Sequence, residues 1–202
     1  MFFKVKKIKD RWWLIMPSGE IFFSIGLNHF DPSTMRYQEN ISIWKNKYNS
    51  NIHEWLKKSV SKNLKIWGFN TVGWVQDLTI RTYQHSRNFT IDEYNSINLP
   101  YCHMLPFIES HQWDKHSNNY DILSPEWEEW CDYVARTHVT DLSNDSNLIG
   151  YFYSDTPTWV HTRPINDWRG PIFDPDMMNS DAGIKQLSKL ANHYYKTTYN
   201  AI

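Results

Sequence analysis

Apolar and polar residues alternate with two different periods along the chain, and each period predicts one kind of element. Residues 11–16 and 21–26 are strand-like apolar runs. Between them lies segment 17–20, which contains the proline and glycine typical of a turn. The pattern predicts a β-hairpin whose second arm continues into residues 27–32, where polar groups follow the apolar run.

Residues 52–67 have the apolar spacing of an amphipathic helix, with lysines elsewhere on its surface. Gly68 suits the position just after a helix, and residues 69–75 are rich in strand-forming side chains. This succession of helix, glycine and strand is typical of a βαβ unit. The apolar side of the predicted helix consists of Ile52, Trp55, Leu56, Val60, Leu64 and Trp67.

Strand and helix patterns continue to alternate in the rest of the chain. Further predicted elements are a short helix at 77–85, a strand at 99–108, a helix from Ser124 to residue 142, a strand at 148–153 and a helix at 182–201. Almost continuously apolar strands that alternate with helices predict a parallel sheet with right-handed connections. The predicted fold class is therefore α/β, with an N-terminal β-hairpin followed by four β/α units in a single domain, residues 1–202.

Composition and charge narrow the classes of function. Hydrophobic residues make up 41% of the chain, which is enough for a core, and the net charge of -1 argues against an electrostatic binder of nucleic acid or membranes. Residues 1–9 alternate apolar and basic side chains, unlike a signal peptide, and no run reaches membrane-spanning length. We expect a cytoplasmic protein as given, and a secretion signal removed before the numbering begins remains the alternative.

Aromatic residues are abundant, with 11 Trp, 12 Tyr and 10 Phe. They either build an aromatic core or, in part, line a sugar-binding cleft, since sugar rings stack on Trp and Tyr. Cys102 and Cys131 show no disulfide framework and are expected to be free, buried thiols. His103, His111 and His116 lack the spacing of metal ligands, so we predict no metal and no cofactor, and His103 is expected to be a hydrogen-bonded core residue.

Polar and aromatic residues follow the predicted strands where parallel strands present functional groups. Asp155, after the strand at 148–153, is the catalytic candidate, either as an acid/base or as a ligand of substrate, and the alternative is an aspartate that caps or orders the loop. Asn28 and His29 end the first parallel strand and either bind sugar hydroxyls or order their own loop. Trp74 ends the second strand, where it is a candidate for stacking on a sugar.

Residues 156–179 form a long irregular stretch, and a loop of this length is more often functional than not. It contains Trp159, His161 and Arg163, a mixture that suits a polyhydroxylated or anionic sugar because arginine supplies a rigid fork of donors. The alternative is a loop held by pairs between its arginines and aspartates.

Three segments resemble the N-terminal half of a clan-A (β/α)8 glycoside hydrolase of the β-agarase-like kind. Residues 11–29 resemble the N-terminal hairpin and first barrel strand, residues 67–73 the second strand, and residues 148–159 the fourth. The resemblance implies half of a (β/α)8 TIM barrel that acts on a poly- or oligosaccharide. In that clan the general acid/base follows strand four and the nucleophile follows strand seven. Here Asp155 lies where the clan has an asparagine, and Thr156 lies where it has the catalytic glutamate.

Half of a barrel has consequences for partners. Four parallel strands do not close, so we expect open sheet edges that are covered by self-association, for example in a homodimer. A glycosidase needs two carboxyl groups, and in the clan the second comes from the other half of the barrel. The alternatives to an enzyme are a non-catalytic carbohydrate-binding or structural half barrel, or a fragment of a larger hydrolase.

Overall fold

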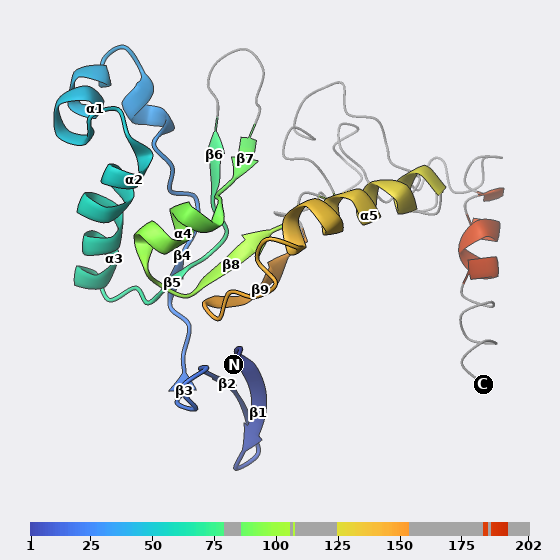
Figure 1. Cartoon of the computed structure of the whole chain (residues 1–202). Helices are drawn as coiled ribbons and strands as arrows, with labels where there is room; N and C mark the ends of the chain where they lie inside the picture. Colours follow the sequence, from blue (N-terminus) through green and yellow to red (C-terminus); the bar gives the residue numbers. More distant parts are fainter. Residues whose placement is uncertain (79–85, 106, 108–124, 154–183, 186, 194–202) are drawn as a thin grey trace. The chain divides into compact units, whose positions relative to one another are not determined.

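Four parallel strands form the central sheet in the computed structural model of the protein. They are β4 (Gly26–Leu27), β5 (Thr71–Val72), β8 (Tyr101–Met104) and β9 (Leu148–Phe152), paired in the order β4-β5-β8-β9 (Figure 1). Each neighbouring pair is parallel. The predicted α/β class with a parallel sheet is therefore confirmed.

The structure describes residues 1–78, 86–105, 107, 125–153, 184–185 and 187–193. The chain divides into two units, one made of Met1–Leu105 with His138–Tyr153 and the other of Pro106–Thr137 with Ser154–Ile202. The parallel sheet lies entirely in the first unit. Within the described residues, no helix is long and apolar enough to cross a membrane.

An antiparallel sheet of three strands precedes the parallel one. It contains β1 (Lys4–Ile8), β2 (Arg11–Ile15) and β3 (Ile21–Phe22). The predicted hairpin is confirmed: the Met16 amide donates to Glu20 O at 2.8 Å, and Gly19 supplies the positive φ of +95° in the turn. The prediction missed β1, although residues 4–8 alternate apolar and basic side chains as an exposed strand does.

The predicted helix at 52–67 is confirmed as α2 (Ile52–Trp55), the π-helical η2 (Leu56–Ser61) and α3 (Lys62–Ile66), which follow one another directly. On its predicted apolar side, Trp55, Leu56, Val60 and Leu64 are buried and Ile52 is partly buried. Trp67, which lies beyond the last helical residue, is 64% exposed. Two elements before this helix were not predicted, η1 (Ser33–Arg36) and α1 (Ile41–Tyr48).

The short helix predicted at 77–85 is wrong where the structure describes it. Residues 77 and 78 belong to β6 (Gln76–Leu78), which pairs antiparallel with β7 (Ser86–Asn88). Pairing with a second strand has overridden the weak local preference for helix. The next element, α4 (Ile91–Ile97), was not predicted, although Thr90 and Glu93 form a capping box at its start.

The later elements follow the predictions. α5 (Pro125–Val139) is confirmed and ends earlier than residue 142, because residues 139–145 form turns, such as the one in which the Leu142 amide donates to Val139 O at 3.2 Å. Described residues 184–185 and 187–193 are helical, within the helix predicted at 182–201. The loop at 156–179 lies outside the described residues.

The hydrophobic core of the first unit joins helices α1–α4 to the sheet (Figure 1). Tyr94 of α4 stacks on Tyr101 of β8 with ring centroids 3.8 Å apart. Aromatic side chains form a large part of this core, namely Trp44, Tyr48, Trp55, Phe89, Tyr94 and Tyr101.

Both cysteines are free and half-buried, and burial raises the pKa of each thiol.

Candidate functional site

The ends of β4 and β5 bring together three residues that the sequence analysis selected. Asn28 and His29 follow β4, and Trp74 follows β5. The two strands are parallel neighbours, so their carboxyl ends lie side by side. The His29 amide donates to Trp74 O at 3.3 Å. We call Asn28, His29 and Trp74 the rim site.

Gly73 lies beneath the side chain of Asn28. A Cβ atom on Gly73 would lie 1.7 Å from Asn28 Oδ1 and 2.9 Å from its Cγ. The Gly73 amide also donates to Leu27 O at 2.9 Å, which holds the two strand ends together. Any larger residue here would displace the Asn28 carboxamide and crowd Leu27 O, which would lie 3.1 Å from the Cβ.

His29 and Trp74 form the second contact of the rim site. Their ring centroids are 4.0 Å apart and the rings are inclined at 71°, an edge-to-face arrangement. His29 is exposed and has a left-handed backbone with φ of 56°, which is uncommon for a residue other than glycine. Trp74 is only 8% exposed. The imidazole is thus presented outward and Trp74 supports it, so His29 is more accessible than the face of Trp74.

The other predicted site residues are not placed. Asp155, Trp159, His161 and Arg163 lie outside the described residues. Their predicted roles stay predictions. In the sequence, Asp155 follows the last residue of β9, Phe152, by three positions.

A buried polar cluster in the same unit was largely missed from the sequence. Asn88 Nδ2 lies 3.2 Å from His103 Nε2 and 3.1 Å from His138 Nδ1, and it donates to Met104 O. On the other side of the His103 ring, Tyr94 Oη lies 3.1 Å from Nδ1. His103 is 3% exposed, which confirms the prediction of a hydrogen-bonded core histidine. No local pattern marks its partners, because Asn88 and His138 lie 15 and 35 residues away along the chain.

The environment of this cluster favours neutral imidazoles. Burial, with a smaller contribution from His138, lowers the pKa of His103 to about 3, and burial also lowers the pKa of His138. The Asn88 Nδ2 group has two hydrogens and three polar neighbours, of which Met104 O accepts, whereas the roles of His103 Nε2 and His138 Nδ1 depend on their tautomers. Among the described residues, no group of three or more His, Cys, Asp or Glu side chains is arranged to hold a metal ion.

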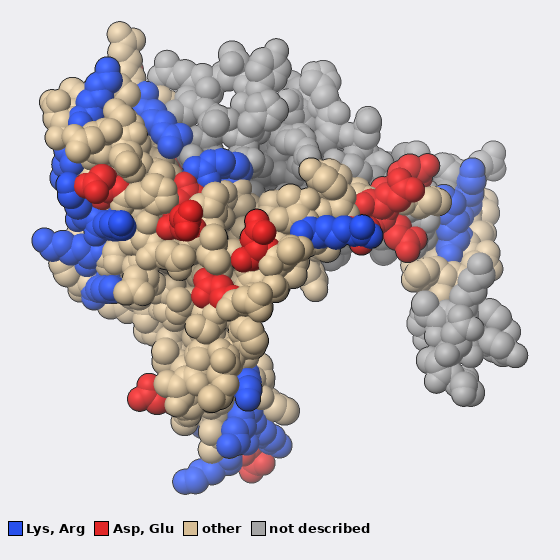
Figure 2. Space-filling model, in the orientation of Figure 1, with Lys and Arg blue, Asp and Glu red and all other residues tan. Residues whose placement is uncertain are grey.

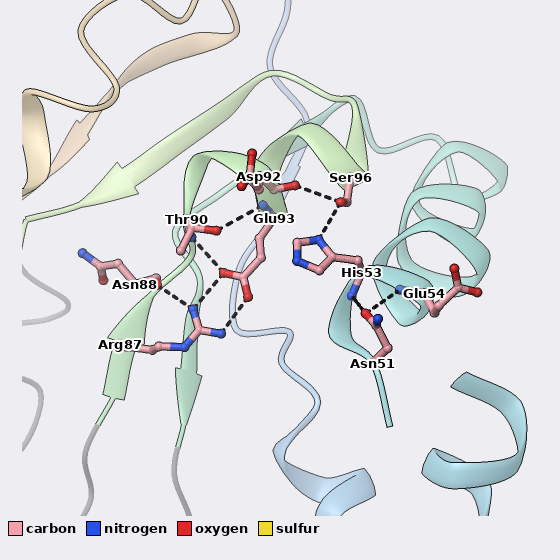
Figure 3. A network of polar contacts seen from close by, with 9 residues as sticks. All are labelled: Asn51, His53, Glu54, Arg87, Asn88, Thr90, Asp92, Glu93 and Ser96. Carbon is pink, nitrogen blue, oxygen red and sulfur yellow. Dashed lines mark hydrogen bonds and ion pairs between the residues drawn. The ribbon is translucent and has the colours of Figure 1, made fainter. Parts of the chain in front are cut away.

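A second network fixes the start of α4 (Figure 3). Glu93 is 3% exposed and accepts hydrogen bonds from Arg87 Nη1 at 2.8 Å and Nη2 at 2.6 Å. It also accepts from the Thr90 amide at 2.8 Å. Burial acts to raise the pKa of Glu93, but the Arg87 and Thr90 bonds outweigh it and hold the pKa below its usual value. Nearby, His53 Nδ1 lies 2.9 Å from Ser96 Oγ, which connects α2 to α4.

Comparisons with protein-family models, with curated proteins and with solved structures found no match. Function must therefore be inferred from the residues and geometry of this chain.

Proposed function

We propose that the chain is a glycoside-hydrolase-like α/β protein that binds a poly- or oligosaccharide at the carboxyl ends of its parallel strands. The observation that carries the proposal is the meeting of Asn28, His29 and Trp74 at the ends of β4 and β5. An amide and an imidazole supply both donors and acceptors, which is what a ring of sugar hydroxyls requires. Both side chains are exposed, and Gly73 and Trp74 support them.

The sheet supports a half-barrel architecture as part of this proposal. In a (β/α)8 barrel, consecutive strands are parallel neighbours and the functional loops follow their carboxyl ends. β4, β5, β8 and β9 occur in this same sequential order. β6 and β7 follow the carboxyl end of β5, so this antiparallel pair is an insertion at the end of the sheet where functional loops lie in such barrels. The order of the strands and the resemblance at residues 11–29, 67–73 and 148–159 thus point to the same half of a TIM barrel.

Catalysis is assigned to Asp155. Its carboxyl group would transfer a proton to the glycosidic oxygen as the bond from that oxygen to the anomeric carbon breaks. A second carboxylate, about 5–10 Å away, would act as the nucleophile or activate the water that completes hydrolysis. Trp159, His161 and Arg163 would contribute further contacts to the sugar. No cofactor is required for this chemistry.

Self-association belongs to the same proposal. β4 and β9 lie at the two ends of the described parallel sheet, where a further strand can pair. A second copy of the chain would cover these edges, and a homodimer would contain two copies of Asp155. Sedimentation at micromolar concentration tests this point, and a stable monomer would contradict it.

A non-catalytic carbohydrate-binding protein is the second candidate function. It is favoured by Thr156, which lies where the resembling hydrolases have their catalytic glutamate. Binding at the rim site does not depend on that glutamate. The two candidates therefore differ in turnover and agree in binding.

A screen of chromogenic glycosides and algal oligosaccharides, with turnover and tryptophan fluorescence as readouts, distinguishes them. We expect Asn28→Ala and His29→Ala to weaken binding roughly tenfold, the size of a lost hydrogen bond to a polar ligand. Asn95→Ala, which removes an exposed asparagine from α4, is the matched control and should bind normally. Loss of turnover in Asp155→Asn supports the enzyme, whereas binding without turnover in the unaltered chain supports the second candidate. Unchanged binding in both rim variants would contradict the proposed site.

A further inference from the structure

Six exposed lysines occupy the outer side of helices α1–α3. We call them the lysine face, and they are Lys45, Lys47, Lys57, Lys58, Lys62 and Lys65. Residues 41–66 contain these six lysines and one acid, Glu54, and so have a net charge of +5. The whole chain has a net charge of -1, which leaves -6 for all other residues. The lysine face is thus one of two local concentrations of positive charge, the other being residues 4–11, with four lysines, one arginine and one acid. Figure 2 shows blue side chains gathered over α1–α3.

The lysines are arranged in a line along the longer helix. Lys58 in η2 and Lys62 and Lys65 in α3 are spaced by four and three residues and are all exposed, so they lie on the solvent side of these consecutive helices. The core side of the same helix consists of Leu56, Val60 and Leu64, which are buried. Packing of the apolar side against the sheet thus holds the lysine line toward solvent.

The charges of the lysine face are poorly compensated within the protein. Lys58 pairs with Glu54, and this pairing holds the pKa of that carboxyl below its usual value. Glu54 is the one carboxylate of residues 41–66. Like charges three and four residues apart destabilise a helix, so the sequence keeps an arrangement that an isolated helix would disfavour. A line of anions lying along the helix would relieve this repulsion.

We propose that the lysine face is a docking surface for an anionic polysaccharide, a sugar chain that bears sulfate or carboxylate groups. Lysine suits such a partner because its ammonium group is a point charge on a flexible stem and does not require a fixed anion geometry. A nucleic acid is less well matched, because domains that bind nucleic acids are usually basic overall and rich in arginine, whereas this chain is not basic and all six cations are lysines. The choice of a sugar polymer rests on the proposed function.

The lysine face is continuous along the chain with the rim site. His29 leads through residues 30–40 directly into α1, which carries the first two lysines. A polymer held along α1–α3 by its charges would stay at high local concentration near the ends of β4 and β5. The surface would then increase the apparent affinity for long anionic chains without contributing a catalytic group.

Two triple variants test the proposal. Lys58→Gln, Lys62→Gln and Lys65→Gln are combined in one protein, and Lys4→Gln, Lys6→Gln and Lys7→Gln in the control. The two lose the same charge, and each includes one lysine that pairs with an acid, Lys58 with Glu54 and Lys7 with Asp10. All six positions are exposed, so both variants should fold, which circular dichroism verifies.

Binding is measured with dextran sulfate, neutral dextran and a single-stranded oligodeoxynucleotide across a range of salt concentrations. We expect the unaltered chain to prefer dextran sulfate, and its binding constant to fall steeply with salt. The helix variant should bind roughly tenfold more weakly, with a log–log salt slope smaller by about two, because each lost contact removes roughly 0.7–0.9 from the slope. The control should stay within about twofold, since its lysines lie on β1, outside the lysine face.

Equal weakening in both variants would overturn the proposal, because net charge rather than the lysine face would then be responsible. The proposal would also be overturned if neutral dextran bound as tightly as dextran sulfate. If the oligodeoxynucleotide bound more tightly than dextran sulfate, the surface would be assigned to nucleic acid instead. The rim variants Asn28→Ala and His29→Ala keep the lysine face intact. They should therefore bind neutral oligosaccharides more weakly and bind dextran sulfate as tightly as the unaltered chain does. Failure of the proposed function is thereby distinguished from failure of the lysine face.

Discussion

His103 Nε2 and His138 Nδ1 lie 3.4 Å apart, so two imidazoles from β8 and from the end of α5 face each other in the interior of one unit. Among the described residues, the polar side chains hydrogen-bonded to these rings are the neutral groups of Tyr94 and Asn88. The arrangement is stable while both rings are neutral. It makes stability dependent on pH.

Acid should destabilise the protein through this pair. Both histidines have a pKa below the ordinary value of 6.5 in the folded state. Their contribution to the free energy of unfolding is therefore complete above pH 6.5 and is lost as the pH falls toward the folded pKa values. For His103 the loss is about 1.4 kcal/mol per pH unit until its pKa of about 3 is reached. Urea unfolding between pH 7 and pH 5 measures it, above the range in which carboxylates titrate.

The variant His138→Gln should flatten this dependence, because it removes one titrating ring and the neighbour that helps to lower the pKa of His103. His193→Gln, a change outside the cluster on the described part of the C-terminal helix, is the control and should keep the slope. An identical slope for His138→Gln and the unaltered protein would show that other groups cause the pH dependence.

Gly73→Ala should disrupt the rim site. Its new Cβ would lie 1.7 Å from Asn28 Oδ1, so the carboxamide must move. Because Asn28 is exposed and can turn away, the free energy of unfolding should fall by about 1 kcal/mol, the low end for overpacking. The double variant Gly73→Ala with Asn28→Ala should recover part of this loss, because the closest atom is then absent. Recovery should be incomplete, since Leu27 O would still lie 3.1 Å from the Cβ. A double-mutant cycle from urea unfolding measures the coupling, and additive effects would contradict the contact.

Glu93→Gln should loosen the start of α4. The substitution removes the charge that accepts two hydrogen bonds from Arg87 and one from the Thr90 amide, and we expect a loss of about 1.5–3 kcal/mol. Arg87 is 47% exposed on its side chain and can turn toward water, which limits the loss. Asp92→Asn changes an exposed acid in the same helical turn and serves as the control, with an effect of a few tenths of a kcal/mol. Equal effects of the two variants in thermal unfolding would show that the buried pair has no special role.

Local patterns predicted the elements whose stability depends on their own residues. The helix at 52–67 was visible because one side must bury four large apolar side chains, and β9 was visible because it is a short apolar run after a cluster of turn residues. The capping box of Thr90 and Glu93 was also present in the sequence and was overlooked. The helix predicted at 77–85 was wrong at residues 77 and 78, because β6 takes its conformation from pairing with β7.

The sequence by itself determined the class of fold and the position of the rim site. Asn28, His29 and Trp74 follow predicted strands, and parallel neighbours necessarily place their carboxyl ends side by side. Only the tertiary structure decided how these residues lie, with His29 outward, Trp74 covered and Asn28 over Gly73. It alone revealed the cluster of Asn88, His103 and His138. Periodicity reports which side of an element is buried, whereas contacts between residues far apart in the chain depend on how complete elements pack.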